Sequence, residues 1–287
     1  MAGWPGIGNI GAIAVNVLME ALRAEEIGEI EPWDFFYPRR LVVRGGEVTD
    51  LEFPASRFLF ARAEQSDILF FSGDEQPSED GGPYARGDTA YRMANLVLDV
   101  AIDFGCSRVY TSGAAVAPIH HASRPKVWAV PNSEALLPEL RGYPNTVLMS
   151  DIAARRGQGS ITGLNGLLLG VAKKRGLEAV CVMGEVPVYL QGLPVPYPKG
   201  SKAVLEVLCA ALGVSAEMEG IDAMIESNER DIGRLYELFP AEMREQIERL
   251  RETGGTSEPG PITDEDKKRI LDDLDRFFQK GTKEDQG

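Results

Sequence analysis

The chain has 287 residues, of which 44% are hydrophobic, and its 30 basic and 44 acidic side chains give a formal net charge of −14. This charge disfavours nucleic acid and anionic membrane surfaces as partners, because both are themselves negative. The sequence holds no apolar run of about 20 residues and no signal-peptide pattern, so we expect a cytoplasmic protein. Cys106, Cys181 and Cys209 are far apart and predict neither a disulfide framework nor a thiolate metal site.

The first element is a glycine-rich stretch, GWPGIGNIG, at residues 3–11, which contains a complete G-x-G-x-x-G. Apolar residues at helical spacing follow and predict an amphipathic helix over 10–22. An anion at the start of this helix could bind near Gly6, Gly8 and Asn9. Any strand before the loop is very short, however, so a tight turn with close backbone packing is the favoured interpretation.

Short apolar runs that end in small or polar residues occupy the middle of the chain. Runs this short and apolar are typical of strands buried on both faces, and they alternate with helical patterns, which favours an α/β layered domain with a largely parallel sheet. In such sheets ligands bind beyond the carboxyl ends of the strands, so we expect the polar strand ends to gather on one rim. The strands are predicted at 68–71, 109–111, 128–130, 147–149 and 180–183, and the helices at 88–104, 164–175 and 201–212.

Two long loops differ from the rest of this region in composition. Residues 74–87 form an acidic loop rich in glycine and proline, and residues 187–200 carry four prolines and two tyrosines. Loops this long in a compact domain are usually functional or mobile. The second loop fits a stiff surface segment and an interaction surface equally well.

The candidate ligand site combines the strand ends with a second glycine-rich helix start, GQGSITGLNG, at 157–166. Hydroxyl and amide side chains there could donate hydrogen bonds to an anion. Helix capping and close packing of the loop on the sheet account for the same residues and are the favoured interpretation. The candidate ligand-binding rim consists of Gly6, Gly8, Asn9, Ser112, Ser160, Thr162, Asn165 and Glu185.

No catalytic constellation is visible in the sequence. It has no H-E-x-x-H, no G-x-S-x-G and no Walker-type G-K-[ST] motif. The only histidines, His120 and His121, are adjacent and have no obvious orienting carboxylate nearby in the sequence, so neither a metal site nor a catalytic base is expected there. We therefore expect no cofactor and no metal, assign no catalytic residue, and regard an enzyme as the less favoured class.

The composition changes after Gly213. Apolar residues recur every seven positions and predict a helix over 217–238, whose narrow apolar seam includes Asn228. A second amphipathic helix begins at Pro240 and is followed by a flexible linker at 254–261. The predicted organisation is an α/β core over 1–213, a helical segment over 214–253 that packs on the core or on a neighbouring subunit, and a linker with an acidic amphipathic tail helix over 254–287.

Three stretches together resemble the proteasome assembly chaperone 2 family: GWPGIGNIG at 3–11, GQGSITGLNGLLLGVAKKRGLEAVCVMGE at 157–185 and PVPYPKGSKAVLEVL at 194–208. The similarity covers about residues 1–250. The resemblance implies a three-layer α/β/α sandwich related to nucleoside phosphorylase and hydrolase-like folds, with a largely parallel or mixed sheet. It also implies homo-oligomers, cyclic ones such as trimers among them, and a role in protein assembly. The family has no agreed catalytic residues to carry over.

Two functional hypotheses follow. The leading one is a non-catalytic assembly chaperone or scaffolding protein that binds itself and other protein subunits, without nucleic acid or membrane partners. The alternative is a small-molecule binding protein or enzyme, for a nucleoside, nucleotide or phosphate, that uses the polar rim. The absent catalytic constellation favours the first hypothesis, and the two glycine-rich helix starts favour the second.

Overall fold

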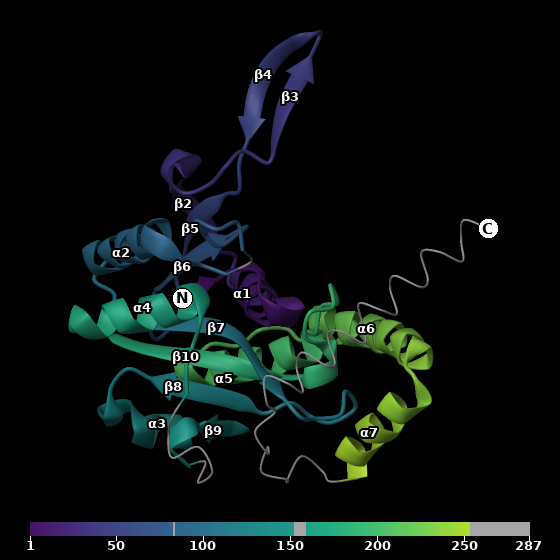
Figure 1. The fold of residues 1–287 in the computed structure, drawn as a ribbon. Helices are drawn as coiled ribbons and strands as arrows, with labels where there is room; N and C mark the ends of the chain where they lie inside the picture. Colours follow the sequence, from purple (N-terminus) through teal and green to yellow (C-terminus); the bar gives the residue numbers. More distant parts are fainter. Residues whose placement is uncertain (83, 152–158, 253–287) are drawn as a thin grey trace.

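The computed structural model describes residues 1–82, 84–151 and 159–252 and shows a twisted mixed sheet between layers of helices (Figure 1). The order of strands across the sheet is β2-β5-β6-β1-β7-β10-β8-β9. The strands are β1 (Ala2–Gly3), β2 (Glu25–Glu29), β5 (Ser56–Ala61), β6 (Ile68–Gly73), β7 (Arg108–Ala117), β8 (Val127–Pro131), β9 (Thr146–Leu148) and β10 (Glu178–Pro187).

Strand direction divides the sheet into a parallel centre and antiparallel flanks. The strands β6, β1, β7 and β10 are parallel, whereas β5 pairs antiparallel with β6 and β8 pairs antiparallel with β10. The prediction that all polar strand ends share one rim is therefore wrong for β8 and β9. Because β8 runs backwards, Asn132 at its end bonds to Ala179 at the start of β10, with an N···O distance of 2.9 Å. The predicted strand positions themselves are confirmed.

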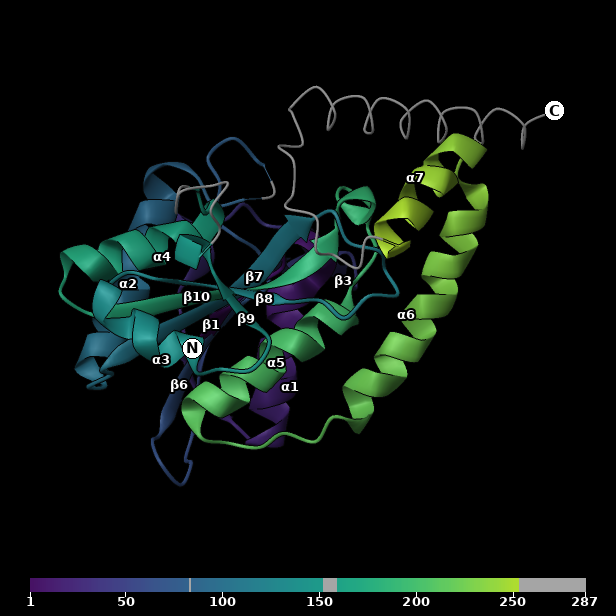
Figure 2. The ribbon, with the colours of Figure 1, turned by 90° about the horizontal axis from the view of Figure 1, so that it is seen from below.

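Helices cover both faces of the sheet and create two hydrophobic cores (Figures 1 and 2). On β10, Val180 and Val182 belong to one core, whereas Cys181 and Met183 belong to the other. This alternation explains the continuous apolar run, because a buried aliphatic side chain on either face stabilises the fold by about 1.5–3 kcal/mol. One face carries α1 (Ile10–Ala21) and α5 (Pro198–Leu212), and the other carries α2 (Gly87–Asp103) and α4 (Gly163–Lys174). The fold is thus the expected α/β/α sandwich.

Short helical segments and two C-terminal helices complete the body. The short segments are α3 (Leu137–Arg141) and the 3-10 turns η1 (Ile7–Asn9), η2 (Pro32–Asp34), η3 (Glu134–Leu136), η4 (Met149–Asp151) and η6 (Val188–Leu190). The C-terminal helices are α6 (Glu219–Leu238) and α7 (Ala241–Glu252). Asn228 in the seam of α6 donates from Nδ2 to the carbonyl oxygen of Pro196 at 2.7 Å. The polar residue therefore fixes α6 on the same chain, and the predicted linker and tail at 254–287 lie outside the described residues.

A two-stranded hairpin projects from the body of the molecule (Figure 1). It consists of β3 (Arg40–Arg44) and β4 (Glu47–Glu52), which pair only with each other. At its base, Arg39 Nε lies 2.7 Å from Glu75 Oε1. We call residues 40–52 the arm. Within the described parts of the chain, no helix combines the length and the apolar character needed to cross a membrane.

Candidate functional site

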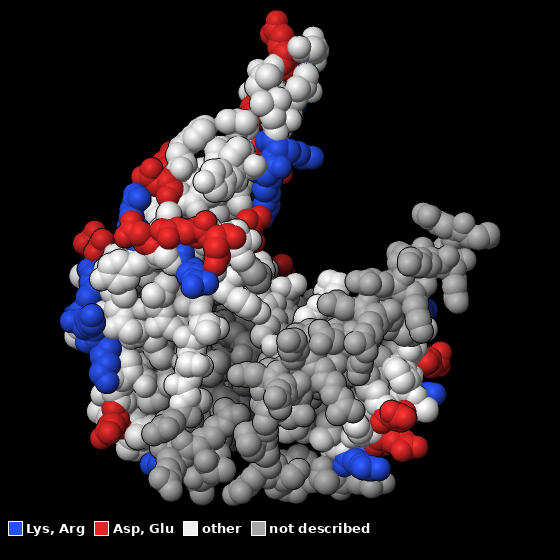
Figure 3. All heavy atoms as spheres, in the orientation of Figure 1, with Lys and Arg blue, Asp and Glu red and all other residues white. Residues whose placement is uncertain are grey.

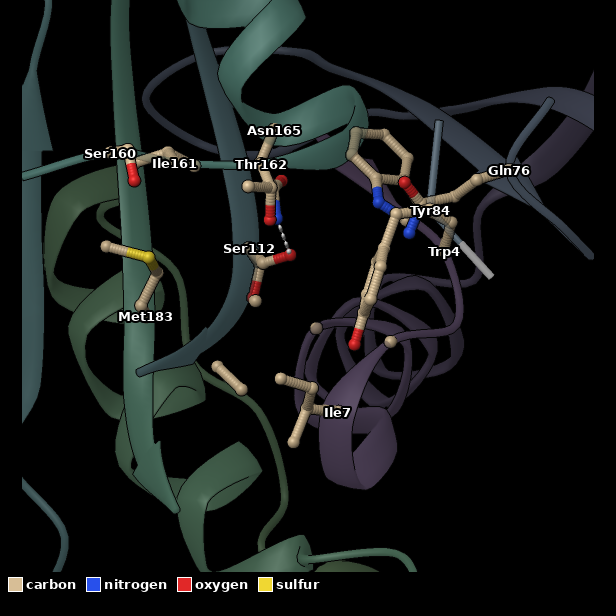
Figure 4. Close-up of a pocket in the computed structure, with 14 residues that line it drawn as sticks. Trp4, Ile7, Gln76, Tyr84, Ser112, Ser160, Ile161, Thr162, Asn165 and Met183 are labelled. Atoms are coloured by element: carbon tan, nitrogen blue, oxygen red, sulfur yellow. Dashed lines mark hydrogen bonds between the residues drawn. The ribbon is translucent and has the colours of Figure 1, made fainter. Parts of the chain in front are cut away.

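A cavity of about 120 Å³ lies beside β7 at the point where β1 ends. Ala2 of β1 pairs with Thr111 of β7, and the chain then leaves the sheet through η1 into α1. The crevice that this departure creates, outside the end of a central parallel strand, is a usual ligand position in α/β sheets. The cavity is lined by Trp4, Gly6, Ile7, Gly11, Gln76, Tyr84, Ser112, Gly113, Ala114, Ser160, Ile161, Thr162, Asn165 and Met183 (Figure 4).

Two glycines allow the helices to approach β7 closely at the cavity. A Cβ atom on Gly11 would lie 2.3 Å from the carbonyl oxygen of Ser112, and one on Gly113 would lie 2.6 Å from Asn165 Nδ2. Both distances are too short for a side chain. Gly11 thus serves the packing of α1 on the strand, as the favoured interpretation of the first glycine-rich stretch predicted, and Gly113 of β7 allows the close approach of Asn165 from α4.

Two polar side chains at the cavity have hydrogen-bonding atoms without a partner. Ser112 is 1% exposed, and its Oγ has no partner. Asn165 donates from Nδ2 to the carbonyl oxygen of Ser112 at 3.3 Å, while its Oδ1 is buried without a partner. Figure 4 marks the hydrogen bond between Asn165 and Ser112 with a dashed line. Buried polar groups in folded proteins are nearly always hydrogen-bonded, so this pair needs an explanation.

Gln76 closes the cavity from the long acidic loop. Its Nε2 donates to the carbonyl oxygen of Pro5 at 3.0 Å, and its Oε1 accepts from the amides of Ala85 at 3.2 Å and Leu164 at 3.1 Å. One amide side chain thus joins the loop after β6 to the starts of α1 and α4. The loop stands out in the sequence by its length, but Gln76 and Tyr84 do not, because only the three-dimensional arrangement brings them to the rim.

The structure brings together part of the predicted rim. Gly8 and Asn9 do not line the cavity; both have positive φ, and Gly8 accepts at its carbonyl oxygen from the Tyr197 amide at 2.7 Å. Glu185 is also elsewhere. Its carboxylate is 2.8 Å from the Lys126 amide and 3.0 Å from Trp128 Nε1, inside the sheet region. The predicted residues that meet at the cavity are Gly6, Ser112, Ser160, Thr162 and Asn165.

The adjacent histidines form a separate cluster beyond the end of β7. His121 Nδ1 lies 2.8 Å from the Tyr189 hydroxyl, and Lys199 Nζ donates to the His121 carbonyl oxygen at 2.9 Å. Burial, together with neighbouring His120 and Lys199, lowers the pKa of His121 to about 4, and burial also lowers the pKa of His120. Both rings are therefore neutral at neutral pH. His120 Nε2 is 3.8 Å from Glu248 Oε1 on α7, so the cluster links the end of the sheet to the C-terminal helices.

The model of the PAC2 family matches residues 1–236 of the chain. The chain belongs to the PAC2 family. It is 28% identical over 242 residues to an uncharacterized protein of Methanocaldococcus jannaschii, a match that covers 84% of this chain and 83% of the relative. The family resemblance noted in the sequence is thereby confirmed.

Solved PAC2-like structures share the fold. PbaB of Pyrococcus furiosus, described as an archaeal proteasome activator, has a TM-score of 0.66 and 25% identity, covering 82% of this chain and 91% of that one. The proteasome-assembly chaperone homologue of Mycobacterium tuberculosis has a TM-score of 0.62 and 22% identity, covering 81% and 93%. These likenesses support the sandwich architecture.

The side chains that line the cavity of this PAC2 protein are uncharged. Among its described lining residues the only titratable side chain is Tyr84, and burial raises its pKa, so its hydroxyl stays protonated near neutral pH. In the described ranges no three His, Cys, Asp or Glu side chains converge in a way that could hold a metal ion. The polar groups that the cavity offers are thus uncharged hydroxyls and amides.

Proposed function

We propose that this PAC2 protein is a non-catalytic assembly chaperone or scaffold that acts in the cytoplasm by binding copies of itself and other protein subunits. The PAC2 membership supports a role in protein assembly, as do relatives described as a proteasome activator and a proteasome-assembly chaperone homologue. The observation that carries the proposal is the arm, which presents an apolar face with no cover from the described residues of its own chain.

The arm has one apolar and one charged face. Leu41 pairs with Leu51 and Val43 pairs with Val48, and cross-strand partners point to the same side of a sheet. Because alternate residues of a strand share a face, Leu41 and Val43 lie on the same side. On the opposite face, Arg40 Nε forms an ion pair with Glu52 Oε2 at 2.5 Å. Such a two-faced ribbon is typical of a sheet that covers another apolar surface.

Exposure of the apolar face indicates that it needs a partner. Leu41 is 51% exposed, Val43 55% and Val48 63%. Aromatic side chains lie next to the arm in the sequence, with Trp33 65% and Tyr37 90% exposed. An isolated two-stranded hairpin is marginally stable in water, and exposed aliphatic and aromatic residues that gather together mark protein interaction sites. Figure 3 shows that the arm stands clear of the body and that most of its visible surface is uncharged.

A second copy of the chain is the proposed occupant of this face. The chain is strongly acidic, with a net charge of −14, so two copies repel each other over most of their surfaces. The aliphatic face of the arm avoids this repulsion, and the same patch on two copies is self-complementary under two-fold symmetry. The arms thus provide the contact through which copies associate, and the rest of the surface remains available to other subunits.

Val43→Lys tests the proposal, with Val42→Lys as its matched control on the opposite face of the same strand. The wild-type protein is expected to be oligomeric by native mass spectrometry and sedimentation velocity at micromolar concentration. Val43→Lys should raise the dissociation constant of the oligomer about tenfold or more, since burying an unpaired lysine costs more than about 1.4 kcal/mol. Val42→Lys should associate as the wild type does. A monomeric wild type, or two variants that associate equally, would refute the role of the arm.

A second candidate function rests on the cavity. The unpartnered polar atoms of Ser112 and Asn165 favour a protein that binds a small molecule, or an enzyme that acts on one. A thermal-shift screen with nucleosides, nucleotides and phosphate tests this function. Stabilisation by one of these compounds would support it independently of the oligomeric state, and no stabilisation by any of them would count against these ligand classes.

A further inference from the structure

We propose that α7 detaches from the body of the protein in mildly acidic solution, and that protonation of His120 drives this change. The conformational change takes place beyond the end of β7 and is independent of both the arm and the cavity. Figure 2 shows α6 and α7 beside the sheet, with a sharp turn between them. Pro240 lies at this turn and lacks an N–H group, so α7 does not continue α6 and can move separately from it.

The buried contact between α7 and the rest of the protein is small. Ile247 is the one buried side chain among residues 241–251, at 3% exposed, and Met243 and Leu250 are partly buried beside it. Glu248 Oε1 accepts a hydrogen bond from the Tyr236 hydroxyl of α6 at 2.8 Å. A helix of 12 residues is only marginally stable by itself in water, so the amides of α7 exchange with solvent whenever the helix detaches.

The docked structure fixes the neutral form of His120. The side chain is 3% exposed, and its Nδ1 accepts a hydrogen bond from the Ala122 amide at 3.0 Å. Because Nδ1 accepts, the hydrogen of the neutral ring is on Nε2. A second proton would have to bind Nδ1, where it would face the N–H group of Ala122. Protonation of the ring therefore breaks this hydrogen bond as well as burying a charge.

The Glu248 carboxylate does not compensate for this cost. His120 Nε2 is buried without a hydrogen-bond partner, and Glu248 Oε1 lies 3.8 Å away, beyond hydrogen-bond distance. The same carboxylate oxygen already accepts from the Tyr236 hydroxyl. The Glu248 side chain is also 47% exposed, so water screens its attraction for a positive ring.

The other groups around the two histidine rings supply no net negative charge. Lys199 forms an ion pair with Glu229, and Arg251 lies 3.8 Å from Glu248. The two neighbouring tyrosines are uncharged in this pH range, because burial raises their pKa. The titratable and charged groups that face His120 and His121 are Glu248 and Arg251 of α7, Lys199 of α5, Glu229 and Tyr236 of α6, and Tyr189 of η6.

Burial thus controls the charge of His120. It lowers the pKa of the ring below the ordinary value near 6.5, and Glu248 opposes this effect only in part. When α7 detaches, the side of the ring that faces Glu248 regains contact with water, and the pKa returns toward 6.5. Below pH 6.5 the detached state therefore binds a proton that the docked state does not, so docking weakens as the pH falls. Between pH 7 and pH 5.5 the ratio of detached to docked protein should rise by about five- to eightfold.

Hydrogen–deuterium exchange of the full chain at pH 7 and pH 5.5 measures this ratio, once the rates are corrected for the intrinsic effect of pH on amide exchange. The protection of residues 241–251 should fall by about five- to eightfold at the lower pH. The core helix α5 should remain better protected than α7 at both pH values, because α7 opens without unfolding of the rest of the protein.

Substitution of the two adjacent histidines tests which ring controls α7. His120→Gln removes the titrating ring, so the protection of α7 should change by less than about twofold between the two pH values. His121→Gln is the matched control, because the His121 ring contacts Tyr189 and Tyr236 rather than α7. This control should keep a fall in the protection of α7 of at least about threefold.

A variant of α7 leaves both histidines in place, in case His120→Gln does not fold. Glu248→Gln keeps an acceptor for the Tyr236 hydroxyl and removes the attraction for a protonated His120. The fall in the protection of α7 at pH 5.5 should therefore be at least as large as in the wild type. Glu245→Gln makes the same change at an exposed carboxylate of the same helix and should reproduce the wild-type fall.

Several results would overturn the inference. Protection of α7 that rises at pH 5.5, or a fall that is smaller in Glu248→Gln than in the wild type, would show that an ion pair with protonated His120 holds the helix in place. Protection that does not depend on pH, or an undiminished fall in His120→Gln, would show that His120 does not control α7. Equal protection of α7 and α5 in the wild type would show that α7 opens only when the whole protein unfolds.

Discussion

Two buried polar groups on adjacent strands illustrate how differently similar positions can be used. Glu185 of β10 and Ser112 of β7 are both at most 6% exposed, and both were predicted as rim residues from their positions after buried runs. Glu185 accepts from the Lys126 amide and from Trp128 Nε1, whereas Ser112 Oγ has no partner. A buried group with its hydrogen bonds made supports the fold, whereas a buried group without them costs stability. Hydrogen bonding, rather than position along the strand, therefore distinguishes these two residues.

The largest expected effect is on the structural side of this comparison. Glu185→Ala removes the acceptor of two donors in a buried region, which should lower the free energy of unfolding by about 2–4 kcal/mol. Urea denaturation followed by circular dichroism measures the change. Glu178→Ala on the same strand is the control. The Glu178 side chain is 44% exposed in its ion pair with Arg108, so its removal should lower the free energy of unfolding by less than about 1 kcal/mol. Equal losses in the two variants would contradict a structural role specific to Glu185.

The sequence allowed the positions of β6 to β10 to be predicted but not their directions. The runs at 128–130 and 180–183 are apolar because both faces of the sheet are covered, and that pattern is the same for parallel and antiparallel strands. The reversed direction of β8 places Trp128 beside Met183 in the register, within reach of Glu185. A contact between residues 57 positions apart leaves no local signal, so Glu185 was grouped with the rim.

The strands β2, β3 and β4 were not predicted for a different reason. Every residue of β2 is exposed, and its sequence EEIGE resembles an acidic loop because no buried face imposes an alternating pattern. In the arm, Thr49 is an extra residue of β4 between the partners of Val42 and Val43, and this bulge breaks the alternation of β4 within a short segment. Conversely, the expected proximity of Ser112 and Asn165 is seen in the cavity that both residues line, because a strand end and a glycine-rich helix start meet where the chain leaves the parallel part of the sheet.

His121 is an intermediate case between the two groups, since its ring is hydrogen-bonded to Tyr189 while burial, His120 and Lys199 lower its pKa and favour the neutral form. Its pKa of about 4 in the folded protein lies below the ordinary value near 6.5. As the pH falls from 6.5 to 4, the unfolded chain binds a proton that the folded chain does not, so stability decreases with falling pH. Because the ring is partly exposed, we expect this pH change to lower the free energy of unfolding by about 1–2 kcal/mol.

Urea denaturation of wild type and His121→Gln between pH 7 and pH 4.5 measures this contribution. Carboxylates such as Glu248 also titrate in the lower part of this range, so the difference between the two proteins isolates the histidine. The variant should show a shallower decrease in the free energy of unfolding. Parallel pH profiles for the two proteins would show that His121 titrates normally and that its environment does not resist protonation.

Loss of the unpartnered Ser112 hydroxyl should have little effect on stability. Ser112→Ala should change the free energy of unfolding by less than about 0.5 kcal/mol, or should increase it, because the variant removes a buried hydroxyl without a partner. Thermal denaturation without added ligand measures this, with Ser56→Ala as a second unpartnered hydroxyl for reference. A serine that costs stability in the empty protein and strengthens binding of a small molecule would be a ligand-binding residue. A loss of 1 kcal/mol or more in the empty protein would instead place Ser112 with Glu185 among the groups that hold the sheet together.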